Sequence, residues 1–297
     1  LDAVTAKLAA NGMDSIVLEE EGEFRQFLEQ NRQYWDYVDD ELLEKMKGVA
    51  RVKFYVTDDE DGHAQLARYT QGLDREYSQT VLGETDWAYS WQKYYKPLAI
   101  GARLYVVPQW EKDQAVPQGR VPLYLNPGLT FGTGSHASTQ LCLEGVEEHT
   151  TAGCSVLDLG CGSGILSIAA LVLGAGYAAA VDIDPKAVGV AYENAELNGV
   201  DRSVYDVCAG DVIGDDTLAA RLGQRSYDLV LANIVADVII PLSARVPQLL
   251  AKDGVFLCSG IIDTRADEVA AALAGHGLTV TKRREKNGWV ALEARRS

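Results

Sequence analysis

The sequence lacks the cysteine pattern of a disulfide-stabilised or zinc-binding protein. Its 297 residues include five cysteines, an odd number, and none of them forms a C-x-x-C pair. A disulfide framework needs paired cysteines, and a structural zinc site needs closely spaced ones. The pattern instead fits a reducing compartment. We therefore expect a cytoplasmic protein without a metal site.

Long apolar runs are also missing. The longest, from Ile165 to Gly176, contains Ser167 and is too short to cross a bilayer. No secretory leader is visible at the N-terminus. The chain begins at Leu1 rather than Met, so we expect that residues preceding it have been removed.

Positive charge is scarce. Lys and Arg number 27 against 43 Asp and Glu, and the formal net charge is −16. Coating a nucleic acid or docking on an anionic membrane requires clustered cations, so we expect no membrane partner and no direct nucleic-acid binding. The acidity permits a basic macromolecular partner, although solubility alone also explains it.

The length favours two domains. Residues 1–100 carry 20 acidic and 11 basic side chains, which places a compositional junction near residue 100. We predict an α+β domain over 1–85, a linker helix over 86–97 that ends before Pro97, and a second domain over 98–297. In the first domain we expect helices at Asp2–Ala10 and His63–Thr70, and strands at Ser15–Leu18 and Val49–Val56.

The second domain alternates short apolar runs with helical stretches. Such alternation predicts an α/β fold with a mostly parallel sheet covered by helices, in which ligands bind at the carboxyl ends of the strands. The expected extended segments are Leu98–Val107, Val156–Leu159, Ala179–Ile183, Asp228–Ala232 and Val255–Ser259.

One of these runs leads into a glycine loop. Gly160, Gly162 and Gly164 follow the strand and precede an apolar helix. A dinucleotide fingerprint would need G-x-G-x-x-G, but Ile165 and Ser167 occupy the positions where the third glycine would fall. A nicotinamide cofactor is therefore disfavoured.

Acidic residues follow the next two strands. Asp182 stands at the tip of the second strand, where a carboxylate can accept both hydroxyls of a ribose. Asp184 is expected to cap the helix that Pro185 opens. Asp211 either faces an adenine from the third strand or is an ordinary turn aspartate.

The loop resembles the first motif of class I S-adenosylmethionine-dependent methyltransferases, which have a Rossmann-like fold. By this resemblance, the three glycines close over the methionyl part of the cofactor. Asp158 is implied to lie near the amino group of the cofactor, directly or through water.

Two further stretches are more specific. Leu125–Thr139, with its Phe-Gly-Thr-Gly-Ser-His run, and Leu231–Val235, with its Ala-Asn-Ile run, closely resemble the bacterial ribosomal protein L11 methyltransferase family. The family implies a ferredoxin-like N-terminal domain for substrate recognition, a linker helix, and methylation of lysines and the α-amino group of that ribosomal protein. We expect the opening strand of that domain to be absent from this sequence, because its pattern is not seen before the first predicted helix. The alternative is a methyltransferase acting on another protein or a small molecule.

The resemblance also implies roles for single residues. Cofactor contacts fall on Thr139, Gly160, Asp182 and Asn233, while Phe131 and residues 132–134 cover the methyl-transfer site. Asn233 is expected to accept hydrogen bonds from the substrate amine and aim its lone pair. His136 either hydrogen-bonds its own loop or contacts a ligand.

The assembly and the C-terminus complete the expectations. We expect a monomer. The basic residues near the C-terminus are interpreted as a solvated strand edge, with contact to ribosomal RNA as the alternative. They are Lys282, Arg283, Arg284, Lys286, Arg295 and Arg296.

Overall fold

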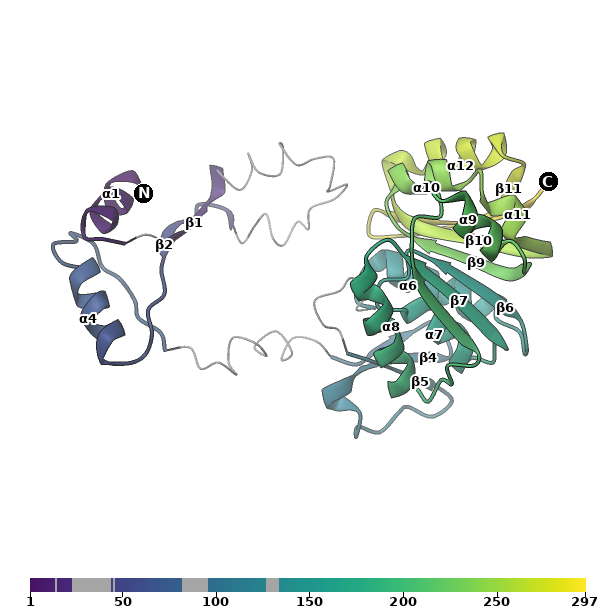
Figure 1. Ribbon diagram of the computed structural model, residues 1–297, viewed down its shortest axis with the longest axis horizontal. Coiled ribbons are helices and arrows are strands. Elements are labelled where there is room, and N and C mark those ends of the chain that lie inside the picture. Colours follow the sequence, from purple (N-terminus) through teal and green to yellow (C-terminus); the bar gives the residue numbers. More distant parts are fainter. Residues whose placement is uncertain (14, 23–43, 45, 82–95, 127–133) are drawn as a thin grey trace. The chain divides into compact units, whose positions relative to one another are not determined.

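The chain divides into two compact units. The computed structural model describes every residue except 14, 23–43, 45, 82–95 and 127–133 (Figure 1). The first unit is Leu1–Trp91 and the second is Gln92–Ser297. Most of the predicted linker helix over 86–97 lies outside the described residues. Among the residues that are described, no helix is long and apolar enough to cross a membrane.

The first unit is an α+β arrangement. It contains α1 (Asp2–Ala10), β1 (Val17–Glu20), β2 (Ala50–Lys53) and α4 (Glu60–Tyr69). The two strands pair antiparallel, with Val17 opposite Lys53. The carboxylate of Asp59 caps α4 by accepting from the N–H of Gly62 at 2.7 Å.

Helix prediction succeeded better than strand prediction in this unit. The helix predicted at Asp2–Ala10 is confirmed, and α4 starts three residues earlier than expected. The strand predicted at Ser15–Leu18 is shifted to β1, and the one predicted at Val49–Val56 shortens to β2. Strand limits depend on pairing, which apolar runs do not reveal.

A seven-stranded sheet forms the centre of the second unit. Its order is β11-β12-β10-β9-β6-β7-β8. The strands β6 to β10 are parallel, whereas β12 pairs antiparallel with β10 and with β11. Their bounds are β6 (Ser155–Leu159), β7 (Tyr177–Asp182), β8 (Tyr205–Ala209), β9 (Tyr227–Asn233), β10 (Leu250–Ile262), β11 (Leu278–Lys286) and β12 (Trp289–Arg296).

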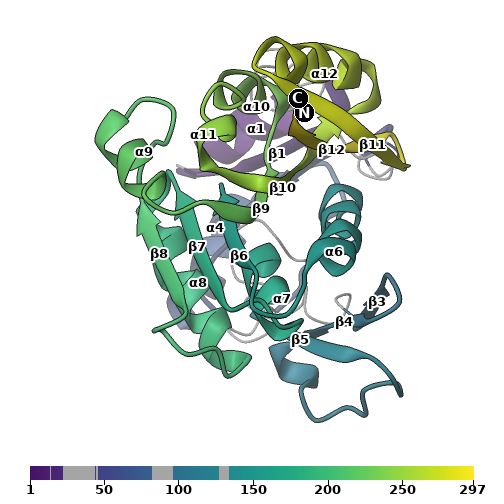
Figure 2. The ribbon, with the colours of Figure 1, turned by 90° about the vertical axis from the view of Figure 1, so that its right-hand side faces the viewer.

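Helices cover both faces of this sheet (Figure 2). Alternate residues of β6 enter two separate cores, Val156 on one face and Leu157 on the other. This period-2 pattern is that of a strand buried on both faces. The first face carries α6 (Ala137–His149), α7 (Ile165–Val172) and α8 (Pro185–Leu197). The other carries α9 (Asp216–Leu222), α10 (Ala236–Leu242), α11 (Val246–Leu249) and α12 (Ala266–Gly275). The predicted α/β class is confirmed.

A small three-stranded sheet corrects one prediction. The single extended segment expected at Leu98–Val107 is a hairpin of β3 (Leu98–Ile100) and β4 (Leu104–Pro108), which turns at Gly101 with φ of 54°. The parallel partner of β4 is β5 (Val121–Leu125). The end of β5 leads into the loop that resembles the family motif.

The basic C-terminal residues lie on the β11–β12 hairpin, and β11 is an edge strand. Arg295 and Arg296 donate to the backbone carbonyls of Asp253 and Leu250. The remaining four cations pair with carboxylates: Lys282 with Glu148, Arg283 with Asp267 and Glu285, Arg284 with Glu148 and Glu293, and Lys286 with Glu144. These pairs fit the interpretation as a strand edge.

A partly buried ion-pair network ties α6 to this hairpin. The side chain of Glu293 on β12 is 4% exposed and pairs with His149 of α6 at 2.8 Å and with Arg284 at 2.6 Å. Glu148, His149 and Glu293 place three potential metal-ligand atoms within 4.8 Å of one another. Because Arg284 and Lys282 already pair with these carboxylates, we interpret the cluster as structural.

Replacing Glu293 tests this network. Burial alone would raise the pKa of Glu293, but the hydrogen bond from His149 and the charges of His149, Arg284 and Lys282 hold it below its ordinary value of 4.5. A lowered folded-state pKa stabilises the fold above pH 4.5, and this stabilisation is lost as the pH falls through the folded value. We expect Glu293→Gln to lower the free energy of unfolding by about 3 kcal/mol at pH 7 in urea titrations.

Glu268→Gln is the matched control. Glu268 also pairs with an arginine, Arg265, but its side chain is 55% exposed. An exposed pair contributes about 0–1 kcal/mol, so this variant should stay close to the parent. The difference between Glu293→Gln and the parent should shrink below about pH 4. A difference that stays constant across the pH range would contradict the charge argument.

Candidate functional site

The glycine loop turns tightly between β6 and α7. Gly160 and Gly164 have φ of 77° and 76°, in the left-handed region that favours glycine. A Cβ on Gly160 would lie 2.5 Å from the side chain of Ile234, and one on Gly164 would lie 2.6 Å from the hydroxyl of Tyr205. Both glycines are therefore required by backbone conformation and by close neighbours.

Asp158 lies fully buried at the base of this loop. Its Oδ2 accepts from the backbone N–H of Ser167 at 3.1 Å and from the hydroxyl of Ser167 at 2.9 Å. Its Oδ1 has no hydrogen-bond partner among the described residues. Burial raises the pKa of Asp158 to about 6, despite the hydrogen bonds from Ser167. A buried, half-satisfied carboxylate is costly and commonly marks a ligand site.

Asp182 joins the ends of two neighbouring strands. Its Oδ2 accepts from the N–H of Gly162 at 2.7 Å, and its Oδ1 accepts from the N–H of Asp184 at 2.9 Å. The carboxylate thus orders the glycine loop and the turn after β7. Asp184 accepts from the N–H of Lys186 at the start of α8, so its predicted capping role is confirmed.

Asn233 ends β9 and contacts α6. Its Nδ2 donates to Oγ1 of Thr139 at 3.1 Å. Thr139 is completely buried in the first turn of α6. The Oδ1 of Asn233 is buried and has no hydrogen-bond partner in the described part of the chain. The bond that Asn233 donates to Thr139 therefore fixes the amide and leaves its oxygen as an acceptor.

Two other predicted residues have structural contacts. Asp211 is exposed and accepts from the N–H of Ile213 at 2.9 Å, which is the contact of a turn aspartate. His136 caps α6: its Nδ1 accepts from the N–H of Ser138 at 3.3 Å, and its ring meets Trp289 edge-on at 4.5 Å. His136 thus makes the contacts expected of a residue that orders its own loop.

Phe131 and residues 127–133 lie outside the described residues, so their predicted cover over the site stays a prediction. Asn126, the residue before this segment, is held by α8. The N–H of Asn126 donates to Oδ1 of Asn194 on α8 at 2.8 Å, and Nδ2 of Asn194 donates to the carbonyl of Ser163 at 2.9 Å. Asn194 therefore links the end of β5 to the glycine loop.

The predicted site residues that the structure describes lie at the carboxyl edge of the sheet or in the elements beside it. Parallel register aligns Leu159 with Val181, Asp158 with Leu231, and Asp182 with Ala209. This edge presents the glycine turn, the Asp182 carboxylate, and the buried oxygens of Asp158 and Asn233 that have no hydrogen-bond partner among the described residues. Such donors and acceptors fit a ligand that carries an ammonium group and hydroxyls, as S-adenosylmethionine does.

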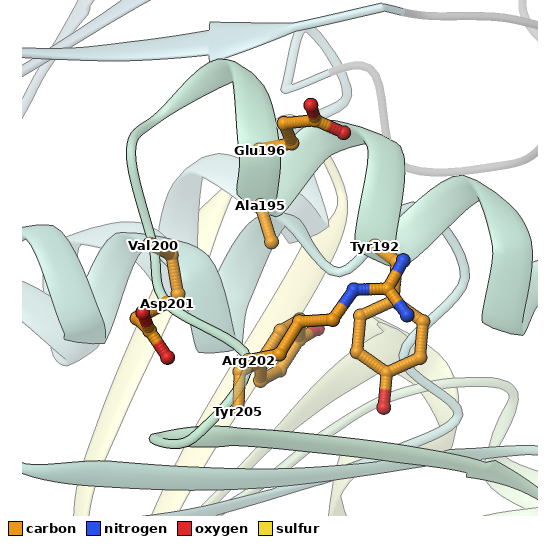
Figure 3. Close-up of a pocket in the computed structure, with 7 residues that line it drawn as sticks. All are labelled: Tyr192, Ala195, Glu196, Val200, Asp201, Arg202 and Tyr205. Carbon is orange, nitrogen blue, oxygen red and sulfur yellow. The ribbon is translucent and has the colours of Figure 1, made fainter.

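A surface hollow among the described residues lies elsewhere. About 420 Å³ opens beside α8 and the first residue of β8, lined among others by Tyr192, Arg202 and Tyr205 (Figure 3). None of the predicted site residues lines it. Because β8 is parallel to β6 and β7, its first residue lies at the edge opposite the carboxyl ends.

Sequence reasoning missed three buried polar residues behind the site. Asn194, Ser167 and Tyr205 contact the glycine loop or Asp158, and each is at most 1% exposed. The polar residues within apolar helical stretches, Ser167 in α7 and Asn194 in α8, were the available signal. A polar side chain on a buried helix face needs a partner.

The comparisons with known proteins agree with one another. A family model described as Ribosomal protein L11 methyltransferase (PrmA) matches residues 1–297. A ribosomal protein L11 methyltransferase from Desulfitobacterium hafniense is 41% identical, over 88% of this chain and 83% of that protein. One from Heliobacterium modesticaldum is 37% identical, over 100% of this chain and 93% of its own length. The crystal structure of a ribosomal protein L11 methylase from Lactobacillus delbrueckii subsp. bulgaricus is 32% identical with a TM-score of 0.59, covering 68% of this chain and 100% of that one.

Substituting Gly164 tests the geometry of the loop. Gly164→Ala places a Cβ against the hydroxyl of Tyr205 and forces a non-glycine residue to a positive φ. We expect a loss of about 2–3 kcal/mol in the free energy of unfolding, measured in urea.

Gly189→Ala serves as the control. Gly189 lies within α8, and a Cβ there would meet no atom within 4 Å. This substitution should stabilise the chain by about 0.5–1 kcal/mol through helix propensity. Equal effects of the two alanines would refute the steric requirement at Gly164.

Proposed function

The chain belongs to the ribosomal protein L11 methyltransferase family, and we propose that it transfers methyl groups from S-adenosylmethionine to amines of ribosomal protein L11. The acceptors are lysine side chains and the N-terminal α-amine. The observation that carries this proposal is the buried Oδ1 of Asn233, an unpartnered acceptor held by Thr139 at the glycine-loop edge. Bound S-adenosylmethionine would supply an electrophilic methyl group on a sulfonium.

The cofactor-binding residues follow from their contacts and positions. Asp158 would accept from the amino group of the cofactor through Oδ1, and Asp182 would accept from the ribose hydroxyls. Asp211 would approach the adenine. The backbone at Gly160, Gly162 and Gly164 would lie against the methionyl part. Thr139 and Asn233 would complete the predicted contacts.

One further residue fits the adenine. Ile183 lies between Asp182 and Asp184 and is 74% exposed, so its side chain is accessible to a ligand. Because Ile183 follows Asp182, which is proposed to bind the ribose, its side chain would pack against the flat face of the adenine.

The role of Asn233 follows from the chemistry of amines. A lysine amine has a reference pKa of about 10.4, so its deprotonation at pH 7 costs about 4–5 kcal/mol. A nearby sulfonium and an apolar pocket both disfavour the ammonium form and lower that cost. The Oδ1 of Asn233 would accept a hydrogen of the neutral amine and aim its lone pair, and Phe131 would exclude water.

The first unit would recognise the substrate. Residues 1–100 carry 20 acidic and 11 basic side chains, a balance that attracts a basic protein and speeds its association. We therefore propose residues 1–85 for recognition, 86–97 for the linker helix and 98–297 for catalysis.

Location and partners complete the proposal. The five cysteines are unpaired, which fits a reducing cytoplasm. The ion-paired hairpin cations support the proposal that the enzyme does not bind nucleic acid directly. We also propose that it acts as a monomer.

A labelling experiment tests the function. The full chain is incubated with methyl-labelled S-adenosylmethionine and ribosomal proteins from a strain that lacks this methylation. We expect label on ribosomal protein L11, because the proposed site accepts its amines, and mass spectrometry would identify the modified positions.

A truncated chain lacking residues 1–85 is the companion sample. It should bind S-adenosylhomocysteine but leave L11 unlabelled, because recognition is assigned to the first unit. Label on a different protein with the full chain would refute the proposed substrate. Labelled L11 with the truncated chain would refute the proposed recognition domain.

Variants of the Asn233–Thr139 pair test the mechanism. Asn233→Ala removes the acceptor oxygen, so we expect kcat on L11 to fall about 100-fold, the scale of losing one oriented polar group at a reaction centre. Binding of S-adenosylhomocysteine, measured by calorimetry, should weaken less than tenfold. Steady-state kinetics at saturating cofactor give kcat.

Thr139 supplies a matched pair of controls. Thr139→Ser keeps the hydroxyl that holds the Asn233 amide and should retain most of the turnover. Thr139→Val keeps the shape but loses the hydroxyl, and should reduce kcat. Unchanged kinetics in Asn233→Ala would rule out its assignment.

A further inference from the structure

A chain of buried polar side chains lies beneath the glycine loop. The hydroxyl of Tyr205 on β8 is 3.0 Å from Oγ of Ser167 on α7. That Oγ is 2.9 Å from Oδ2 of Asp158 on β6. All three residues are at most 1% exposed. Three elements that are separated in sequence thus converge on one carboxylate.

The direction of the hydrogen bonds follows from the available protons. An ionised Asp158 carboxylate only accepts, and the hydroxyl of Ser167 has one proton, for which the Asp158 oxygen at 2.9 Å and the carbonyl of Gly164 at 3.1 Å compete. The charged carboxylate is the nearer and stronger acceptor. When Ser167 donates to Asp158, its oxygen is left to accept, and Tyr205 becomes the donor. The hydrogen bonds are then donated from Tyr205 to Ser167 and from Ser167 to Asp158, and each bond polarises the next.

The hydroxyl of Tyr205 is held in place by its surroundings. Its ring meets that of Tyr192 edge-on at 5.9 Å, and Arg202 lies 4.2 Å above the Tyr192 ring. These three side chains line the same hollow, where Figure 3 shows Tyr205 beneath Arg202 and beside Tyr192. On the inner side, Gly164 leaves room for the hydroxyl that a Cβ would fill.

The charges and the burial around Asp158 indicate what these hydrogen bonds do. Burial raises the pKa of Asp158, the two hydrogen bonds from Ser167 lower it, and the charge of Asp182 raises it further. The thiols of Cys142 on α6 and Cys161 in the loop also face it, and burial raises the pKa of both, so they stay neutral. Ser167 therefore supports the charged form against burial and a neighbouring carboxylate.

We propose that Tyr205 and Ser167 are positioning residues for cofactor binding, which keep the Asp158 carboxylate ionised and oriented for the ammonium group of S-adenosylmethionine. The inference rests on the proposed function, in which Asp158 receives that group. The unpartnered Oδ1 supplies the acceptor, while Oδ2 is occupied by Ser167. Tyr205 acts through Ser167 and touches no ligand itself.

Tyr205→Phe in the full chain tests the proposal, because it keeps the ring and removes only the hydroxyl. The dissociation constant of S-adenosylhomocysteine is measured by calorimetry between pH 5.5 and 8.5. Losing a donor disfavours the charged carboxylate, so the pH below which binding weakens should rise by about half a unit. Binding should therefore weaken about threefold at pH 5.5, where the carboxyl is mostly protonated, and less than twofold at pH 7. The KM for S-adenosylmethionine should rise more than kcat falls.

Tyr192→Phe is the matched control. Its hydroxyl belongs to the same aromatic pair but accepts from the N–H of Val207 at 3.0 Å instead of contacting Ser167. This variant should keep the parent pH midpoint. Ser167→Ala removes the direct donor and should shift the midpoint further than Tyr205→Phe, while Asp158→Asn should abolish the pH dependence.

The outcomes separate this inference from the proposed function. Parent-like midpoints and affinities in both Tyr205→Phe and Ser167→Ala would overturn the positioning role. If Tyr205→Phe does not fold, Ser167→Ala alone decides the question by the same midpoint. Failure of the parent chain to bind S-adenosylhomocysteine would overturn the proposed function instead.

Discussion

The bond between the Gly162 amide and the Asp182 carboxylate, 2.7 Å long, is the contact on which the site depends. It satisfies the N–H of Gly162 in the turn after β6, and it adds to the bonds that the N–H groups of Gly160 and Cys161 donate to the carbonyl of Val181 near the end of β7. The turn itself exists because Gly160 and Gly164 accept a left-handed backbone. Asp158 lies fully buried beneath this turn. These contacts order the loop, the Asp182 carboxylate and the buried Asp158 oxygen together.

Helix α6 connects this site to the rest of the second unit. Thr139 in its first turn holds the amide of Asn233, and His149 in its last turn enters the network with Glu293 and Arg284. The C-terminal hairpin therefore contacts the end of the helix opposite to the end that holds the Asn233 amide. The cations on β11 of the hairpin pair with carboxylates of α6 and of neighbouring elements.

Much of the fold was predictable because local rules agree with the tertiary structure. The cap at Asp184 with Pro185 behind it and the strand–glycine–helix order at Gly160 are local signals. The two strands Leu98–Ile100 and Leu104–Pro108 could not be distinguished from one long strand, because the residue pattern of Leu98–Val107 is extended throughout. The turn at Gly101 depends on the pairing of the two strands. Strand limits in the first unit shifted for the same reason.

The amino-acid sequence by itself determined the parallel α/β class, the glycine loop and the acidic residues at the strand ends, because these follow from periodicity and spacing within short segments. It also carried the family resemblance at Leu125–Thr139 and Leu231–Val235. Only the tertiary structure decided which polar atoms meet. The contacts of Tyr205 with Ser167 and of Asn233 with Thr139 join residues 38 and 94 positions apart. Such pairs form because buried polar groups must find partners that packing alone brings within reach.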